Sequence, residues 1–574
     1  MPIPHSLTSA SHADLDLTLA SGAWPADLTG EIFISAPTVA PDLAYALFGF
    51  GVMVRLSLQS GTFGAPADRW AWRTRTIESP TQRLHAKAPE AFSPTPLGYQ
   101  SPFGSPNMAN TAPLPWGDRL FATWDVGRPS EVDALSLDFL GEVGHKESWG
   151  SSFLASDDLL PFYFSTAHPI IDPDRNCLWT VKLLPVNFDP IELQPWVVRY
   201  DGDGTEVRCW PVEGAKVRGS MHTISQTRDW LVLADSGNFK ADPGEMHTGV
   251  RTVTVDDEVS VYLVRKDLLD TTKPGQPLAS HCFPLAPSTG HYYGAYDDSD
   301  GKVRVVFEHM DRLDLGLNVR PDDRDAFDNP IDPAYIGLYN WGMSPHSLSE
   351  VTFDPAKGTA TVEAIRNDDT MWNQQLSGMD WSTEGISAPT LHHIVYHGFR
   401  SGTITQRALA LYGDRVDRSR FPAEDQVGSL VTYERGSLDR LGRYDMPSLD
   451  DMPTSPTFVP RDPGAASDAS RYAGTKPGGH DGYIVLPVMN DDAFRIEVFD
   501  AGRVADGPIA TLKGANNEQV PFLLHSAWAP RAVNAPSVER LRFADELDEA
   551  GMAKVGDDHL RRVVHEVADE LATA

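Results

Sequence analysis

The 574-residue chain is poor in cysteine, poor in basic residues and free of long apolar runs. Its three cysteines, Cys177, Cys209 and Cys282, stand far apart without CxxC spacing, which argues against a disulfide scaffold and a thiolate metal site. Lys and Arg number 48 against 80 Asp and Glu, which gives a formal net charge of −32. An acidic surface repels phosphate groups, so we expect no nucleic acid partner.

Features of targeting and of membrane spanning are also missing. Residues 1–22 contain no basic region followed by an apolar run, and no stretch approaches the ~18 apolar residues of a membrane-spanning helix. Together with the cysteine pattern, these absences predict a cytoplasmic protein.

Turn-forming residues are abundant, with 46 Gly and 45 Pro. Between them lie short runs rich in β-branched and aromatic residues, a composition typical of strands. Four units of strand, Asp- or Gly-containing turn and strand occur at 170–183, 198–210, 295–307 and 351–364. Long helical patterns do not alternate with them. This favours an all-β fold of antiparallel hairpins in radial array, a β-propeller, over several sandwiches.

The last 39 residues have a different pattern. Apolar residues recur there at helical intervals, namely Leu560, Val563, Val564, Val567 and Leu571. We therefore expect a β-propeller domain over 1–535 and a C-terminal helical extension over 536–574. Packing of this extension on the body is the first interpretation, and self-association is the alternative.

Four histidines stand at the edges of strand-like runs: His168, His222, His291 and His525. Each alone is more often a buried core residue than a ligand. Their separations are too long for a local metal motif, so only a closed fold could bring them together. The inner strands of a propeller converge on one axis, where four neutral imidazoles would suit Fe, Zn, Cu or Ni.

The segments around these histidines resemble, in the same order, the four histidine blocks of the carotenoid cleavage oxygenases. They are AHPIIDPD (167–174), MHTISQTRDWLVLAD (221–235), HYYGAYDD (291–298) and VPFLLHSAWAP (520–530). Similar matches occur at LTGEIFISAPT (28–38), LFGFGVMVRLSL (47–58) and DGYIVLPVMNDDAFRIEVFDA (481–501). The resemblance extends over about residues 20–530, and its joint pattern is specific although each block alone is weak.

This resemblance implies a seven-bladed β-propeller with a dome of loops and helices. It further implies a single Fe(II) held by His168, His222, His291 and His525, with no organic cofactor. The family's reaction splits a C=C bond with O₂ into two carbonyl products. The expected substrate is a small apolar alkene, carotenoid-like or apocarotenoid, held in an apolar tunnel.

Several residues depart from the family pattern. Acids that orient three of the histidines in the family correspond here to Asp125, to Asp380 with Glu384 as a rival, and to Ser455. Two shorter acids and one lost charge imply a tuned or weaker iron site. Thr223 also stands where the family usually has Asp.

Two other functions stay open. One is cleavage of a stilbene or phenylpropene by the same chemistry. Relatives that cleave hydroxylated stilbenes tend to carry a lysine before the first orienting acid, whereas this chain has Trp124, whose apolar face suits a polyene. The other is a propeller that binds a ligand or partner without oxygenase activity, which the altered acids would allow.

Residues outside the matching positions receive less specific interpretations. The histidines His309, His392, His393 and His397 are interpreted as structural or exposed. The aromatic stretch 41–51 is expected to be buried, with a tunnel mouth or peripheral membrane contact as alternatives. The sequence does not predict an oligomeric state.

Overall fold

The computed structural model describes residues 12–573 with fourteen internal gaps. The gaps are residues 39–48, 96–97, 154–157, 189–190, 219, 237–257, 287–288, 310–318, 337–344, 380–388, 413–415, 462–481, 491–493 and 515–519. Within these limits the chain is dominated by antiparallel strands, as the hairpin pattern predicted.

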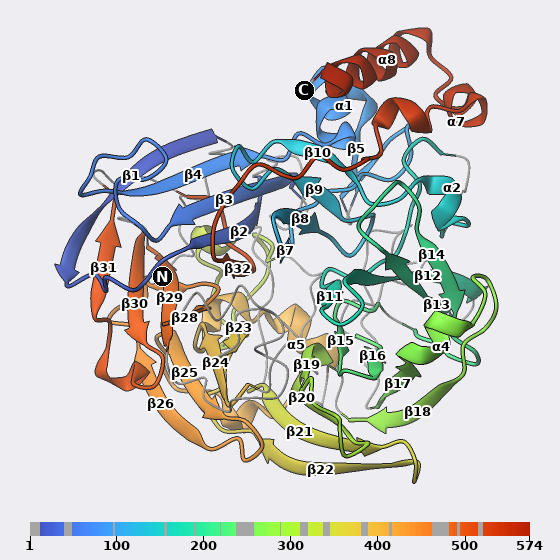
Figure 1. Cartoon of the computed structure of the whole chain (residues 1–574). Coiled ribbons are helices and arrows are strands. Elements are labelled where there is room, and N and C mark those ends of the chain that lie inside the picture. The colour runs from blue at the N-terminus through green and yellow to red at the C-terminus, as the bar shows by residue number, and fades with distance from the viewer. Residues whose placement is uncertain are drawn as a thin grey trace.

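Five four-stranded sheets are arranged around a common centre (Figure 1). Their strands are β7 Ala112–Trp116, β8 Arg119–Thr123, β9 Ser130–Val132 and β10 Phe139–Glu142; β11 Ile170–Asp172, β12 Cys177–Phe188, β13 Ile191–Tyr200 and β14 Arg208–Pro211; β15 Ile224–Gln226, β16 Trp230–Ala234, β17 Val259–Arg265 and β18 Ser280–Leu285; β19 Thr289–Gly294, β20 Val303–His309, β21 Ser347–Asp354 and β22 Thr359–Arg366; β23 Gln374–Met379, β24 Leu391–Tyr396, β25 Ser429–Glu434 and β26 Arg440–Asp445. Each sheet is a meander of neighbouring strands, which is the organisation of a propeller blade.

A ten-stranded sheet completes the circle and joins the two ends of the chain. Its strands are β1 His12–Gly22, β2 Glu31–Pro37, β3 Gly51–Ser57, β4 Trp70–Thr76, β27 Met452–Pro453, β28 Thr457–Pro460, β29 Gly482–Met489, β30 Arg495–Asp500, β31 Ala510–Lys513 and β32 Ser526–Ala529. The chain is thus a β-propeller, but the predicted count of seven blades is wrong. The described residues form five separate blades, because β1 pairs with β4 and also with β31, so the strands at the two ends of the chain form one sheet.

Hairpin turns connect the strands where the sequence indicated. The turn between β19 and β20 contains Gly301 at φ +76°, and the turn between β21 and β22 contains Gly358 at φ +66°. These left-handed conformations cost glycine little because it has no Cβ. Eight residues separate β19 from β20 and four separate β21 from β22, and both pairs are antiparallel.

Apolar side chains fill the space between successive sheets, so most blades are buried on both faces. Successive residues of a strand point to opposite faces. Val305 of β20 accordingly belongs to the same apolar cluster as Val261 of the preceding sheet, whereas Val306 belongs to the cluster that contains Ile394 of the following one. This two-sided burial explains why the strands read as continuous apolar runs rather than alternating ones.

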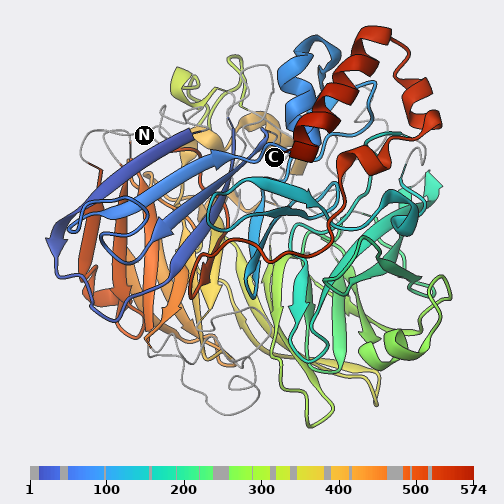
Figure 2. The same ribbon diagram turned by 45° about the horizontal axis from the view of Figure 1, so that its top comes forward.

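Helices are few, and most are short. They are α1 Pro80–Lys87, α2 Lys146–Trp149, α4 Lys266–Thr271, α5 Gln406–Tyr412, α7 Glu549–Lys554 and α8 Asp558–Thr573, with 3₁₀ turns η2 Pro89–Ala91, η4 Pro333–Tyr335, η5 Ser401–Thr403, η7 Arg418–Arg420, η9 Val504–Asp506 and η10 Phe543–Glu546. A two-stranded sheet of β5 Ser93–Thr95 and β6 Gly98–Gln100 follows α1 and η2 in the chain. In Figure 2, α1 and α8 lie side by side above the sheets.

Two expectations concern segments that the structure describes only in part. Of the stretch 41–51, residues 41–48 lie outside the described part, while Phe50 is buried in an apolar cluster with Trp124 and α8. None of the helices in the described ranges has the length and apolar character to cross a bilayer.

Candidate metal centre

Each of the four predicted histidines lies at the inner edge of a different sheet. His291 is within β19, and His168, His222 and His525 directly precede or closely approach β11, β15 and β32. These strands surround the centre of the ring in Figure 1. The closed arrangement thus brings together side chains that are far apart in sequence.

Hydrogen bonds between the blades hold these segments in register. The His168 backbone N–H donates to the His222 carbonyl at 3.2 Å, and the Thr166 hydroxyl donates to the same carbonyl at 2.8 Å. The Thr223 hydroxyl donates to the carbonyl of Gly290, beside His291, at 2.9 Å. The imidazoles are therefore carried by a connected backbone frame.

The four imidazoles converge on one point. One ring nitrogen from each lies within 4.8 Å of the nitrogens of the other three. Ring centroids of His168 and His525 are 4.3 Å apart, and those of His222 and His291 are 5.1 Å apart. Four nitrogen donors in this space match what a single divalent transition ion requires.

The protonation of the cluster favours ligand binding. Burial, together with the neighbouring histidines, holds the pKa of His168 and of His525 well below the ordinary value. Burial also lowers the pKa of His291, although Glu308 opposes the shift. Neutral imidazoles keep the lone pair that a metal ion needs.

Two ring nitrogens of the cluster lie close enough to bind the same ion. Nε2 of His222 lies 3.2 Å from Nε2 of His291, while the Nδ1 atom of each ring faces a carboxylate. A proton on each Nδ1 leaves a lone pair on each Nε2. Nε2 of His168 is also buried without a hydrogen-bond partner among the described residues. These side chains therefore fit a bound metal ion.

Asp125, the first predicted orienting acid, contacts the second histidine. It lies between β8 and β9, and its Oδ1 accepts a hydrogen bond from Nδ1 of His222 at 2.8 Å. With Nδ1 in this contact, Nε2 is the ring nitrogen directed towards His291 in the cluster. The arrangement is the carboxylate–histidine pair common at metal sites.

A second carboxylate, Glu308, was not predicted from the sequence. Its side chain is fully buried in β20, with Oε2 3.4 Å from Nδ1 of His291 and Oε1 2.7 Å from Nε2 of His392. Burial opposes its ionisation, but the two histidines hold its pKa well below the usual range. The signal was a glutamate inside the apolar run VRVVFEH, on the strand that pairs with the one carrying His291.

The other predicted positions lie elsewhere or outside the described residues. Asp380 and Glu384 fall in the undescribed segment 380–388. Ser455 is buried, and its hydroxyl accepts hydrogen bonds from the backbone N–H and the hydroxyl of Ser526, the residue after His525. Among the described residues, no carboxylate contacts the ring of His525.

The four remaining predicted histidines are all buried, and none belongs to the cluster. His309 bonds to the Ser349 hydroxyl at 2.7 Å, and His393 bonds to the Thr432 hydroxyl at 2.9 Å. Nε2 of His397 donates to the Pro453 carbonyl at 2.7 Å. His392 differs from these because it contacts Glu308.

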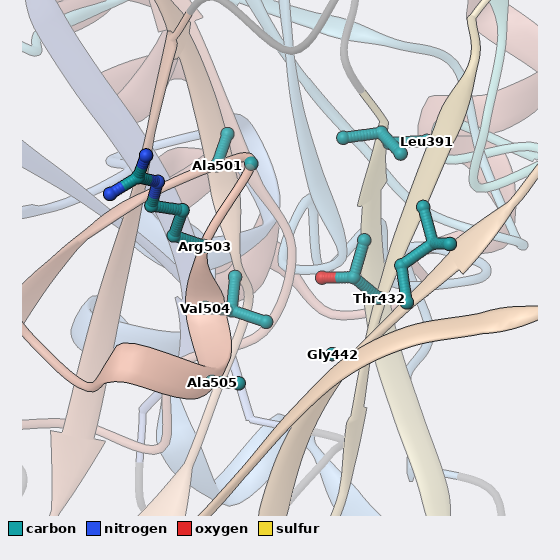
Figure 3. Close-up of a pocket in the computed structure, with 9 residues that line it drawn as sticks. Leu391, Thr432, Gly442, Ala501, Arg503, Val504 and Ala505 are labelled. Carbon is teal, nitrogen blue, oxygen red and sulfur yellow. The ribbon is translucent and has the colours of Figure 1, made fainter.

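A separate pocket of about 220 Å³ lies beside η9, at the ends of β24 and β26 (Figure 3). Its lining is mostly aliphatic, with Leu391, Leu441 and Val504, and Arg503 stands at its edge. No cluster histidine lines it. It is therefore distinct from the candidate metal centre.

Comparison with known proteins agrees with this picture. Residues 5–530 match the retinal pigment epithelial membrane protein family, whose members are carotenoid oxygenases. Resveratrol cleavage oxygenase 1 of Botryotinia fuckeliana (strain B05.10) is 26% identical over 257 residues, a match that spans 43% of this chain and 42% of that protein.

Solved structures share the fold at low identity. A mutant of the Synechocystis apocarotenoid oxygenase superposes with a TM-score of 0.61 at 17% identity, over 91% of this chain and 97% of that one. A cobalt-substituted form of the Synechocystis enzyme gives 0.60 at 17% identity, with the same coverage. At this identity the likeness establishes the fold.

Proposed function

Because the chain belongs to the carotenoid cleavage oxygenase family, we propose that it is an Fe(II)-dependent dioxygenase that cleaves a C=C bond of an apolar alkene. We further propose an apocarotenoid or carotenoid-like substrate, with O₂ as co-substrate and two carbonyl compounds as products. The single observation that carries the proposal is the convergence of His168, His222, His291 and His525 in a chain of this family.

The four imidazoles would hold the iron. Iron(II) with four neutral nitrogen ligands supplies the redox chemistry that O₂ requires and that zinc lacks. The protein's own part is to keep His168, His291 and His525 neutral by burial, and to orient His222 through its hydrogen bond to Asp125. Because these ligands lie in or next to the inner strands of a closed ring, rigid elements of the fold would position them.

Trp124 supports an apolar substrate. It directly precedes Asp125 and is 8% exposed, within an apolar cluster that also contains Phe50, Met108 and Leu160. An indole here offers an apolar face beside the residue that contacts His222. It supplies no positive charge to ionise a phenol, which disfavours a hydroxylated stilbene.

The metal centre is tested by removing one imidazole. His291→Ala should lose bound iron and O₂ uptake, because a three-histidine remnant holds the ion more weakly. His393→Ala is the matched control, since it removes another buried imidazole that contacts Thr432 and not the cluster. Iron content and O₂ uptake would be measured for both variants. Full iron and full activity in His291→Ala would contradict the proposal.

The substrate class is tested by comparing rates on apocarotenals and on a 4-hydroxystilbene. We expect cleavage of an apocarotenal by the iron-loaded protein, with products identified by mass spectrometry. Trp124→Lys should reduce that rate and raise the relative rate on the phenol, whereas Trp124→Phe keeps an apolar ring as the control. Cleavage of the stilbene alone by the unmodified protein would reverse the preference.

Stilbene cleavage is the second candidate function, and one observation favours it. The curated relative described above is named as a resveratrol cleavage oxygenase, although its match spans less than half of either chain. A propeller without oxygenase activity is the third possibility. Absence of metal and of O₂ uptake with every alkene tested would support that third function.

A further inference from the structure

Glu308 lies outside every segment that resembles the family. Its Oε2 nevertheless lies 3.4 Å from Nδ1 of His291, a histidine of the cluster. In the register of β19 and β20, Glu308 is the direct partner of His291. Directly paired residues on antiparallel strands project to the same face at about 5 Å. The hairpin itself therefore presents the carboxylate to the imidazole.

The two oxygens of Glu308 face two different histidines. Oε1 accepts a hydrogen bond from Nε2 of His392 at 2.7 Å, across the boundary between two blades. Oε2 lies 3.4 Å from Nδ1 of His291 and has no hydrogen bond of its own among the described residues. A small turn of the His291 ring would complete that contact.

His392 secures the carboxylate from the other side. It is fully buried in β24, where its ring also lies 6.1 Å from that of Tyr293. A buried carboxylate without a donor would be strongly disfavoured, so the hydrogen bond from His392 makes the anion tolerable at this position.

The electrical charges of the site are consistent with a divalent ion. Asp125 and Glu308 each contact one histidine of the cluster, and together they carry two negative charges. Ser455 supplies no charge near His525. Two buried or half-buried anions therefore face the two positive charges of the expected metal.

We propose that Glu308 is the residue that positions His291 for metal binding, and that His392 holds Glu308 in place. In this arrangement, the Glu308 carboxylate accepts a hydrogen bond from the Nδ1–H of His291, which keeps the proton on Nδ1 and directs the Nε2 lone pair into the cluster. The inference rests on the proposed metal centre and adds two residues that act through His291. Neither residue belongs to the four-histidine cluster.

The decisive variant is Glu308→Gln, with Co²⁺ as the probe. Removing such a partner of a ligating histidine typically weakens metal binding by roughly 10- to 100-fold. We expect that loss in a competition titration against a chelator, together with an altered visible spectrum of bound Co²⁺. Glu308→Asp should recover part of the affinity, and His392→Gln should give a smaller loss than Glu308→Gln.

Glu131→Gln is the matched control. Glu131 is a buried glutamate in β9 of another blade, and its carboxylate pairs with Arg119 and Arg540 instead of a histidine. Its loss should lower the unfolding temperature and leave Co²⁺ affinity unchanged. The comparison separates a general cost of losing a buried carboxylate from an effect on the metal.

The outcomes distinguish this inference from the proposed function. Wild-type affinity and spectrum in folded Glu308→Gln would overturn the proposed arrangement and leave the metal centre intact. If Glu308→Gln does not fold, wild-type Co²⁺ affinity in both Glu308→Asp and His392→Gln overturns it equally. Failure of the unmodified protein to bind Co²⁺, or unchanged binding in His168→Ala, would overturn the metal centre and the arrangement with it.

Discussion

Two carboxylates face the Nδ1 atoms of His222 and His291. If Nε2 of each of these rings is to present its lone pair to the cluster, the proton must reside on Nδ1. Oδ1 of Asp125 accepts a hydrogen bond from Nδ1 of His222 at 2.8 Å. At the scale of single residues, the ligand geometry therefore depends on side chains that do not themselves bind the ion.

Asp125→Asn should weaken metal binding without removing a ligand. An amide carries no negative charge and accepts the Nδ1 hydrogen bond less strongly, so roughly a 10- to 100-fold loss of affinity is expected. A metal competition titration would measure it. Asp118→Asn, which changes an exposed carboxylate paired with Arg531, is the control and should bind metal normally. Equal affinities for the two variants would exclude the role of Asp125.

At the scale of elements, the C-terminal helices are attached to the body by both apolar and ionic contacts. Val563, Val564 and Val567 of α8 are buried in the cluster that contains Leu84 of α1. In η10, Glu546 pairs with the buried Arg128 at 2.6 Å. The amphipathic pattern of this segment is therefore satisfied within one chain.

Val564→Ala should destabilise the attachment of α8 to α1. Val564 is fully buried, and the loss of its two methyl groups should cost about 2 kcal/mol. Limited proteolysis of the C-terminal segment and thermal unfolding would show the effect. His565→Ala, at an exposed position of the same helix, should change neither. Unchanged protease resistance in Val564→Ala would mean that this contact does not hold the helix.

At the scale of the whole molecule, the ring is closed by strands from both ends of the chain. β32 pairs with β2, and β31 pairs with β1. His525 directly precedes β32, so ring closure also brings the fourth imidazole to the other three. The pairing of β32 with β2 therefore closes the ring and also places His525 in the cluster.

The burial of two further histidines, His346 and His397, makes the stability of the fold depend on pH. Burial lowers the pKa of His346 to about 4 and that of His397 to about 3, well below the ~6.5 of an unfolded chain. The unfolded state therefore binds more protons between these values. This contribution to stability is fully present above pH ~6.5 and falls by about 1.4 kcal/mol per pH unit and per histidine as the pH drops.

His397→Gln should reduce this acid sensitivity. A glutamine amide can still donate to the Pro453 carbonyl but does not titrate. Near pH 5, the number of protons taken up on unfolding should fall by about one relative to the wild type, and by about half that at pH 6.5. Denaturant unfolding at several pH values measures it, with His565→Gln as the exposed control. The same pH slope in all three proteins would contradict the assignment.

Local patterns predicted much of this protein. Turn residues such as Gly301 and the apolar runs on either side define hairpins, since strand pairing across a tight turn is a short-range event. The helical periodicity of 560–571 likewise depends only on neighbouring residues. The resemblance of four short segments also identified the histidines that the structure brings together, although their role as ligands stays a prediction.

Tertiary structure decided what depends on distant segments. The predicted number of blades was wrong because β1 pairs with β4 on one edge and with β31 on the other, which joins the strands of both chain ends in one sheet. No local sequence pattern specifies the second of these partners. The contact of Glu308 with both His291 and His392 requires a hairpin register and the packing of two blades, so no linear spacing revealed it. The sequence by itself determined the hairpins, the helix and the candidate ligands. Only closure of the ring could determine which side chains share the centre, because that proximity arises from contacts between blades rather than from order along the chain.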